Sequence, residues 1–186
     1  MLWVLAPAAC FANDKKIIVS AFKVNHRIDC FGFLFKEKKN PRSIVLEKVK
    51  MYEIPEAYYG ELQKGKDYTT KKGTIVCNEG VTEPAVAARC YAYCADTIYD
   101  ETIAHKIKGA DLVYHETTYL KDLEDRAAAR FHCTTEQAGK IATLAGVKLL
   151  IGHFSSKYDV LDDFLRETKA VFENTELALE GACFKV

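Results

Sequence analysis

The part of the chain that follows Gly73 alternates short apolar segments with longer amphipathic ones, and this alternation strongly constrains the fold. Val147 to Gly152 is a nearly continuous apolar run, which is typical of a buried strand. It lies between two segments, 134–145 and 161–172, that carry apolar residues at helical spacing. Strands that alternate with helices in this way predict an α/β layered fold.

The same criteria predict the remaining elements. Runs rich in β-branched and aromatic residues predict further strands over 16–24, 30–35, 74–77, 90–94, 111–115 and 176–186. A further helix is predicted over 100–108, where Gly109 ends it. In the helix over 134–145, Thr134 and Gln137 form a capping-box pattern and Gly146 follows the last turn.

The segment 36–72 differs from the rest in charge and pattern. It holds ten Lys or Arg against six Asp or Glu, a local net charge of +4 in a chain whose formal net charge is zero. Its periodicity is weak, so we expect it to project from the sheet with few apolar contacts to the core. A basic segment suits a polyanionic partner, although a solvated charged loop has the same composition.

The cysteines and the first twelve residues indicate the cellular compartment of the protein. Seven cysteines without a C-x-x-C pair argue against a disulfide framework and a zinc ribbon, and indicate buried thiols in a reducing cytoplasm. The apolar start, 1–12, has no basic residue and is shorter than the roughly 20 residues that span a membrane. We interpret it as the start of a domain whose beginning is missing, rather than as an export signal.

Histidines and an aspartate cluster at the ends of the predicted elements. Asp96, His115 and His153 each follow the C-terminal end of a buried strand, the edge at which α/β sheets collect catalytic groups. His26 follows another strand, and His132 precedes a helix. Histidine and carboxylate side chains are suitable zinc ligands, and imidazole can donate protons near neutral pH.

Each of these residues also has a structural interpretation. A histidine at a strand end is often a hydrogen-bonded loop residue, and Asp96-Thr97 alone fits a turn or a helix cap. Cys133, next to His132, fits a structural cysteine better than a thiol–base pair, because adjacent side chains rarely face each other.

Five motifs in order resolve this choice. They are HRIDCFGF from His26, YAYCADT from Tyr91, HETTY from His115, HCTTEQA from His132 and HFSSKY from His153. Together they cover nearly the whole chain from about Lys15 onward, and they resemble the ribonuclease Z family in its bacterial form. The resemblance implies the C-terminal half of a metallo-β-lactamase-like αββα sandwich, without the N-terminal half.

The resemblance also implies a reaction and a set of roles. The family cleaves precursor transfer RNA to make the mature 3′ end, with two zinc ions, in the cytoplasm, as a homodimer and without a membrane. Asp96 would bridge the two metals, and His26 and His153 would each ligate one of them. The remaining roles would be His132 as catalytic proton donor, His115 and Glu116 as supporting residues, and Ser155 and Lys157 as contacts to substrate phosphate.

The sequence departs from the family pattern in several places. Thr117 stands where alanine is usual, Cys133 where serine is usual, and Lys157 where arginine is usual. Lysine keeps the positive charge but loses the bidentate phosphate fork, which predicts weaker substrate binding. No two histidines are two residues apart, so the family's His-x-His-x-Asp-His motif, which would supply four metal ligands, is missing.

We therefore expect one partial domain over 1–186, with an arm-like insert at 36–72 where the family carries its transfer-RNA-gripping arm. The expected function is that of a zinc-dependent endoribonuclease acting on precursor transfer RNA. Two alternatives remain: another phosphodiesterase of the same fold, and a non-catalytic fragment that binds RNA or a partner.

Overall fold

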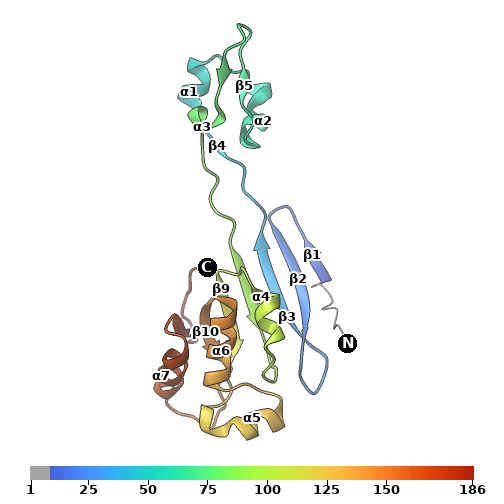
Figure 1. Cartoon of the computed structure of the whole chain (residues 1–186), viewed down its shortest axis with the longest axis vertical. Coiled ribbons are helices and arrows are strands. Elements are labelled where there is room, and N and C mark those ends of the chain that lie inside the picture. Colours follow the sequence, from blue (N-terminus) through green and yellow to red (C-terminus); the bar gives the residue numbers. More distant parts are fainter. Residues whose placement is uncertain (1–8) are drawn as a thin grey trace. The chain divides into compact units, whose positions relative to one another are not determined.

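The computed structural model describes residues 9–186 and divides the chain into two compact units (Figure 1). The first combines Met1–Glu37 with Arg89–Val186, and the second is Lys38–Ala88. The second unit is thus an insertion between two strands of the first, and each unit is described by itself below.

The first unit is built on one mixed sheet of seven strands. In spatial order these are β1 (Ala9–Asn13), β2 (Ile17–Val24), β3 (Cys30–Glu37), β8 (Cys90–Cys94), β9 (Leu112–Glu116), β10 (Lys148–Gly152) and β11 (Thr175–Leu177). Strands β1, β2, β3 and β8 pair antiparallel, and β8 to β11 pair parallel. Parallel neighbours need crossover connections, and helices provide them here.

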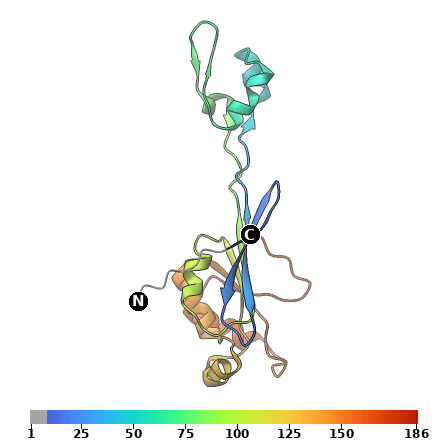
Figure 2. The ribbon, with the colours of Figure 1, turned by 90° about the vertical axis from the view of Figure 1, so that its right-hand side faces the viewer.

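Three crossover helices cover one face of the sheet: α4 (Thr102–Ile107), α6 (Thr135–Ala145) and α7 (Asp162–Val171). The short 3-10 turn η2 (Lys121–Leu123) and helix α5 (Glu124–Arg130) lie in the connection between β9 and α6. Figure 1 shows α4, α6 and α7 over the same face, and Figure 2 shows the helices to one side of the sheet. Right-handed crossovers between parallel strands place successive helices on one side in this way.

The main core lies between this face and the helices. Val113, Leu149 and Ile151 alternate inward along β9 and β10 and are completely buried. Ile141 of α6 and Phe164 of α7 meet them from above and are 1% and 0% exposed. Burying side chains of this size contributes about 1.5–3 kcal/mol each, so this layer fixes the parallel half of the sheet.

The opposite face of the sheet carries aromatic side chains. Tyr93 and Tyr114 stack with ring centroids 4.9 Å apart, and Phe35 stacks on Tyr91 at 5.9 Å. Phe11, on the edge strand β1, packs edge-on against Phe33 and stays 71% exposed. No helix among residues 9–186 covers this face, and residues 184–186 line a hollow there with Phe35 and Tyr91.

The second unit has a core of its own. Its elements are β4 (Ser43–Ile44), α1 (Leu46–Met51), η1 (Glu56–Tyr58), α2 (Tyr59–Gln63), β5 (Tyr68–Thr69), β6 (Ile75–Val76), α3 (Asn78–Val81) and β7 (Thr82–Glu83). Strand β4 pairs with β7, and β5 pairs with β6. The core residues are Val49, Ile54, Leu62, Val76 and Val81.

Most predicted elements are present, and the differences include strand β1, which was not predicted. The strand predicted over 176–186 is only Thr175–Leu177, because the chain turns away and reaches a positive φ at Gly181. The strand predicted over 74–77 belongs to the inserted unit, where it pairs with β5, because Val76 is buried in the small core. Helix α5 was not predicted, since its sequence EDRAAAR has no apolar stripe.

The cysteines also differ from the expectation of buried thiols. All seven lie within residues 9–186 and are unpaired, but Cys10, Cys77 and Cys183 are exposed. Cys94 and Cys133 are buried as expected. The predicted start of the domain, 1–12, is described only from residue 9, where β1 begins, and the rest lies outside the described residues.

No helix in the part of the chain that the structure describes is both long enough and apolar enough to cross a lipid bilayer.

Candidate metal centre

The candidate site lies where several strands end on the same edge of the sheet. Strands β8, β9 and β10 are parallel, so Asp96, Glu116 and His153 emerge together at their carboxyl ends. Strand β2 runs in the same direction, because it is related to β8 by two antiparallel pairings through β3. His26, two residues after β2, therefore reaches the same edge, and His132 reaches it from the connection between α5 and α6.

The side chains of four of these residues converge. His153 Nε2 lies 3.3 Å from Asp96 Oδ1. The His132 ring lies between the other two, with its centroid 5.2 Å from that of His26 and 5.4 Å from that of His153. The structure thus brings together the three predicted ligands and the predicted proton donor.

The side chain of Glu116 is hydrogen-bonded to several groups around this cluster. Its side chain is completely buried, and its two carboxylate oxygens accept five hydrogen bonds. Oε1 accepts from the backbone N–H groups of Thr97 and Cys133 and from His132 Nδ1, at 3.0–3.1 Å. Oε2 accepts from the Thr118 backbone N–H at 3.1 Å and from its hydroxyl at 2.8 Å. A buried carboxylate with this many donors is stabilised as an anion.

The three histidines use the same ring nitrogen for support. Nδ1 of His26 lies 2.9 Å from the carbonyl oxygen of Phe131, and Nδ1 of His132 lies 3.0 Å from Glu116. Nδ1 of His153 lies 2.9 Å from the Thr118 hydroxyl. Each ring therefore keeps Nε2 for another partner, which is how outer contacts commonly orient metal-ligating histidines.

The donor set fits zinc. Two groups of side chains among the described residues have ligand atoms within 4.8 Å of one another, His26–Asp96–His132 and Glu116–His132–His153. Ligands about 2.0–2.1 Å from a tetrahedral zinc lie roughly 3.3–3.4 Å apart, which matches the separation of Asp96 and His153. Glu116 is a poor candidate ligand, because its oxygens are already occupied by five donors.

Two residues near the site adopt a left-handed backbone conformation that is unusual for residues other than glycine. Phe131 has φ 61° and ends α5, and His153 has φ 60° directly after β10. Such conformations cost of order 1–3 kcal/mol each and persist where the surroundings enforce them. Here they direct the Phe131 carbonyl toward His26 and place the His153 side chain beside Asp96.

Hydrogen bonding and burial shift the pKa values of three groups at the site, namely His132, Cys133 and His115. The hydrogen bond to Glu116 raises the pKa of His132, which favours the imidazolium form. Burial raises the pKa of the Cys133 thiol well above its usual value, and its Sγ donates to the Thr97 carbonyl at 3.2 Å. Burial lowers the pKa of His115, which keeps that ring neutral inside the protein.

His115 stands apart from the other predicted site residues. Its ring is fully buried and donates from Nδ1 to the Glu116 backbone carbonyl at 2.6 Å, while Nε2 has no partner. It belongs to neither group of possible metal ligands.

Ser155 and Lys157 lie in the loop that follows His153. The Ser155 backbone N–H donates to the Thr118 carbonyl at 3.1 Å. Lys157 is exposed, with its ammonium 4.4 Å from the Tyr158 ring centroid and 5.9 Å from that of Tyr119. Aromatic contact restrains the lysine while its charge stays accessible to solvent.

Comparison with known proteins relates this arrangement to a family. No protein-family model matches the chain. The ribonuclease Z of Bacteroides thetaiotaomicron is 40% identical over 175 residues, which are 94% of this chain and 55% of that protein. The ribonuclease Z of Cytophaga hutchinsonii is 42% identical over 171 residues, which are 90% of this chain and 54% of that protein. The chain is a partial homologue of ribonuclease Z.

Solved structures agree on the fold of this ribonuclease Z homologue. The metallo-β-lactamase fold protein YhfI from Bacillus subtilis aligns with a TM-score of 0.61 at 18% identity, over 94% of this chain and 52% of that one. The short form of human tRNase Z aligns with a TM-score of 0.53 at 21% identity, over 92% of this chain and 44% of that one. The chain thus has the metallo-β-lactamase fold and spans about half the length of the relatives that it matches.

Sequence reasoning missed two supporting groups in this ribonuclease Z homologue. Thr118 lies within the HETTY motif, but nothing in the sequence indicates that its hydroxyl reaches His153. The Phe131 carbonyl holds His26 across 105 residues of sequence, and a backbone group gives no sequence signal. Both contacts depend on the way the strand ends meet.

Proposed function

We propose that the chain contributes the catalytic edge of a zinc-dependent endoribonuclease that matures the 3′ ends of transfer RNA. The observation that carries this proposal is the convergence of His26, Asp96, His132 and His153 above the buried carboxylate of Glu116. The homology to ribonuclease Z supports the same conclusion.

In the proposed site, Asp96 would bridge two zinc ions, while His26 would hold the first and His153 the second. A carboxylate suits the bridging position because it offers two oxygens and a negative charge. The chemistry supplied by bound zinc is activation of a water molecule and stabilisation of the attacking and leaving oxygens.

His132 would act as the proton donor. Its Nδ1 is hydrogen-bonded to Glu116, which raises the pKa of the ring and so favours the imidazolium form, in which Nε2 also carries a proton. From there it can protonate the leaving oxygen of the cleaved phosphodiester. An imidazolium does not ligate a cation, so the raised pKa favours this role over that of a metal ligand, although His132 is a member of both ligand groups.

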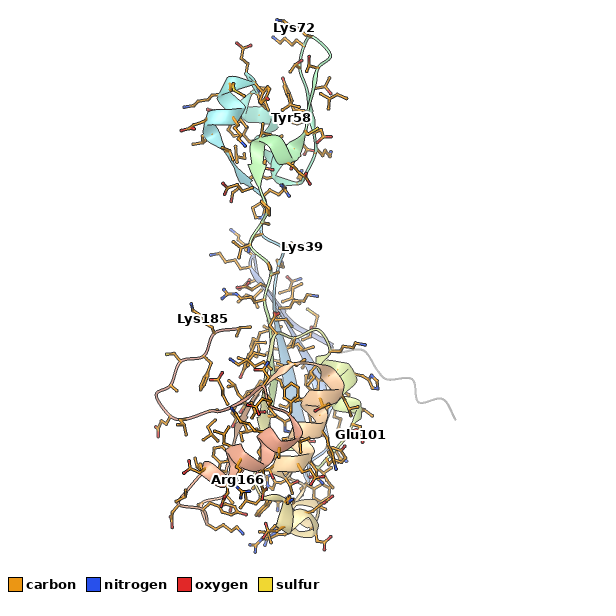
Figure 3. The ribbon with its side chains drawn as sticks, turned by 60° about the vertical axis from the view of Figure 1, so that its left-hand side comes forward. Lys39, Tyr58, Lys72, Glu101, Arg166 and Lys185 are labelled. Atoms are coloured by element: carbon orange, nitrogen blue, oxygen red, sulfur yellow. The ribbon has the colours of Figure 1, made fainter. Side chains whose placement is uncertain are left out.

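Precursor transfer RNA would be held by two further features. Ser155 and Lys157 lie two and four residues after His153 and would contact substrate phosphate. In the inserted unit, Lys71 and Lys72 lie in the turn between β5 and β6 and line a hollow with Tyr52 and Tyr68. Figure 3 shows Lys72 at the end of this hairpin. Basic and aromatic side chains in one hollow suit an RNA backbone and its bases.

The charge of the inserted unit gives only modest support to this arm role. Residues 38–88 hold nine Lys or Arg against seven Asp or Glu, a smaller excess than that over 36–72. Lys64 and Lys66 are paired with Glu61, whose pKa is lowered to about 2 by those two lysines. Lys64 and Lys66 are therefore less available to RNA than Lys71 and Lys72.

The test is reconstitution of cleavage. The chain is combined with the complementary segment of the Bacteroides thetaiotaomicron relative, zinc and a precursor transfer RNA that carries a 3′ trailer. We expect metal-dependent release of the trailer, and loss of that release with Asp96→Asn. A mixture that binds two zinc ions and folds but leaves the precursor intact would contradict the proposal.

Two alternatives are tested by the same materials. Another phosphodiesterase of this fold would cleave a small phosphodiester substrate but would not bind transfer RNA. A non-catalytic fragment would bind RNA or the complementary segment with no stoichiometric metal, which elemental analysis measures. The cytoplasm remains the expected compartment, supported by the unpaired cysteines, and a homodimer remains the expected assembly of the complete enzyme.

A further inference from the structure

We infer that Thr118 is a positioning residue that links the buried Glu116 to His153, so that one carboxylate orients both the proposed proton donor and a proposed metal ligand. The inference rests on the proposed function in one respect: the orientation of His153 serves metal binding only if His153 is a metal ligand. The contact itself is a property of the chain and can be tested without catalysis.

The geometry places the Thr118 hydroxyl between two partners. Its oxygen lies 2.8 Å from Glu116 Oε2 and 2.9 Å from His153 Nδ1. The other carboxylate oxygen, Oε1, is 3.0 Å from His132 Nδ1. Glu116 therefore reaches His132 directly and His153 through a single hydroxyl group.

The direction of each hydrogen bond follows from counting protons. An ionised carboxylate only accepts hydrogen bonds, and a threonine hydroxyl has one hydrogen. That hydrogen is directed to Glu116 Oε2, so the hydroxyl oxygen can only accept from the ring of His153. In this arrangement His153 carries its proton on Nδ1 and presents an unprotonated Nε2 near Asp96 Oδ1, the form in which Nε2 can ligate a metal.

The hydroxyl is itself held rigidly. Thr118 is 5% exposed, its backbone N–H donates to Glu116 Oε2, and its carbonyl accepts from the Ser155 N–H. His153 is by contrast 46% exposed at its side chain and stands on a left-handed backbone. Without the hydroxyl, the other polar contact described for the His153 ring is that of Nε2 with Asp96 Oδ1 at 3.3 Å, which favours a proton on Nε2 instead.

His26 provides an internal reference. Its Nδ1 donates to the Phe131 carbonyl and has no connection to Thr118 or Glu116 among the described contacts. A change at Thr118 should therefore alter the ring of His153 and leave that of His26 as it was. A substitution that loosened the whole edge of the sheet would change the hydrogen bonding of both rings.

The experiment measures the ring nitrogens directly. Nitrogen-15 spectra of the imidazole rings are recorded on the metal-free 186-residue chain at about pH 8.5, roughly two units above the ordinary histidine value. Wild type is compared with Thr118→Val, which has the same shape without the hydroxyl, and with Thr118→Ser, which keeps it. Folding of each variant is checked by circular dichroism.

We expect the wild-type chain and Thr118→Ser to hold the His153 proton on Nδ1. In Thr118→Val the ratio of the two tautomers should shift toward Nε2–H by at least about twofold, the equilibrium effect of one hydrogen bond. In the assembly with the complementary segment, Thr118→Val should weaken zinc binding by roughly 10- to 100-fold, and Thr118→Ser should restore it.

Three results would overturn the inference. The first is a wild-type His153 with its proton on Nε2, which requires no variant and so does not depend on Thr118→Val folding. The second is a folded Thr118→Val chain with an unchanged His153 ring, and the third is loss of the Nδ1 proton in Thr118→Ser as well. A shift at His153 in a protein whose assembly never cleaves RNA would instead reject the proposed function and keep the role of Thr118.

Discussion

Glu116 shows how a charged group can be stable in the interior of this protein. Moving a carboxylate out of water costs several kcal/mol unless hydrogen bonds replace its solvation. Five donors meet its two oxygens, and three of them are backbone N–H groups that the fold fixes in place. The carboxylate is thus fixed next to Nδ1 of His132, where it stabilises positive charge on that ring.

The first prediction concerns the protonation of His132. Replacing Glu116 by glutamine removes the negative charge that raises the pKa of His132, so that pKa should fall. The protonated fraction near pH 7 should fall with it. Nuclear magnetic resonance titration of the His132 ring in the metal-free chain measures both, and Glu136→Gln, which breaks the exposed pair with Lys140, is the matched control.

The same shift has a consequence for stability. Because the folded-state pKa of His132 lies above its unfolded value of about 6.5, the pair stabilises the fold fully below that value. Its contribution is lost as the pH rises through the folded-state pKa. The stability lost in Glu116→Gln, measured by urea unfolding, should therefore shrink as the pH rises across this window. A difference that grows with pH would show that the charge on His132 is not involved.

At this scale the sequence predicts which side chains meet at the edge of the sheet but not what holds them. His26, Asp96, His132 and His153 are recognisable because they stand at the ends of predicted elements, within motifs that resemble ribonuclease Z. The contacts of Thr118 and of the Phe131 carbonyl are not recognisable, because they join positions 35 and 105 residues apart. Such contacts depend on the register of the sheet.

Helix α6 begins with a complete capping box next to the site. The Thr134 hydroxyl accepts from the Gln137 N–H, and the Gln137 side chain accepts from the Thr134 N–H. We predict that Thr134→Ala lowers the free energy of unfolding by about 1 kcal/mol. Thr143→Ala, on the exposed side of the same helix, should change it by less than about 0.5 kcal/mol. Urea unfolding measures both, and equal losses would contradict the capping role.

Strand β10 ends in a close approach that only glycine permits. A Cβ added to Gly152 would lie 2.5 Å from the ring of Tyr114. We predict that Gly152→Ala costs about 1–3 kcal/mol, because either the ring or the strand must move. Since His153 follows directly, its ring resonances should shift as well. Gly60→Ala, which adds a Cβ in open space within the inserted unit, should leave those resonances unchanged.

The elements show where pattern reasoning works and where it fails. The parallel strands are predicted because buried strands are short apolar runs, and α6 is predicted because a capped amphipathic helix has strong periodicity. The strand Ile75–Val76 was predicted, but not its place in the inserted unit, and the strand Thr175–Leu177 was predicted to be longer than it is. Periodicity indicates burial, but it does not say against which core a segment is buried.

At the scale of the whole molecule, the inserted unit should be removable. Glu37 and Arg89 are directly paired, with the Glu37 N–H donating to the Arg89 carbonyl at 2.8 Å and the side chains joined at 3.0 Å. We predict that replacing 38–88 by a short glycine linker keeps the thermal unfolding of the sheet unit cooperative and weakens transfer-RNA binding. Lys71→Glu with Lys72→Glu is the milder comparison, and should weaken binding without altering the fold.

Loss of folding on that deletion would make the insert part of the core. Unchanged RNA affinity in both variants would reject the arm role proposed for it. The two results are independent, because circular dichroism reports the first and filter binding the second.

The last prediction concerns the 186-residue chain by itself. With His26, Asp96 and His153 as its ligands, and Asp96 shared, each zinc ion would have two protein ligands where catalytic zinc normally takes three. We therefore expect weak metal binding, no useful cleavage of precursor transfer RNA, and activity when the complementary segment is added.

The aromatic face of the sheet should add self-association to this behaviour. Phe11 and Phe35 are 71% and 38% exposed, and exposed apolar surfaces of this kind promote association. Phe11→Ser should reduce the apparent mass in sedimentation, whereas Leu144→Ser, at a side chain of α6 that is 58% exposed, should not. Two tightly bound zinc ions and robust cleavage by the chain alone would contradict the prediction and direct attention to His105 or His115 as ligands.

The pairing of β3 with β8 also bears on how the chain folds. These strands are neighbours in the sheet but are separated in sequence by the whole insert, so joining them requires closure of a long loop. Within the insert, Ser43 pairs with Glu83 near its two ends. An insert that collapses first would shorten the effective loop and bring Glu37 close to Arg89. The small unit would then act as a nucleus for the large sheet, and slowing its collapse would slow the folding of the entire chain.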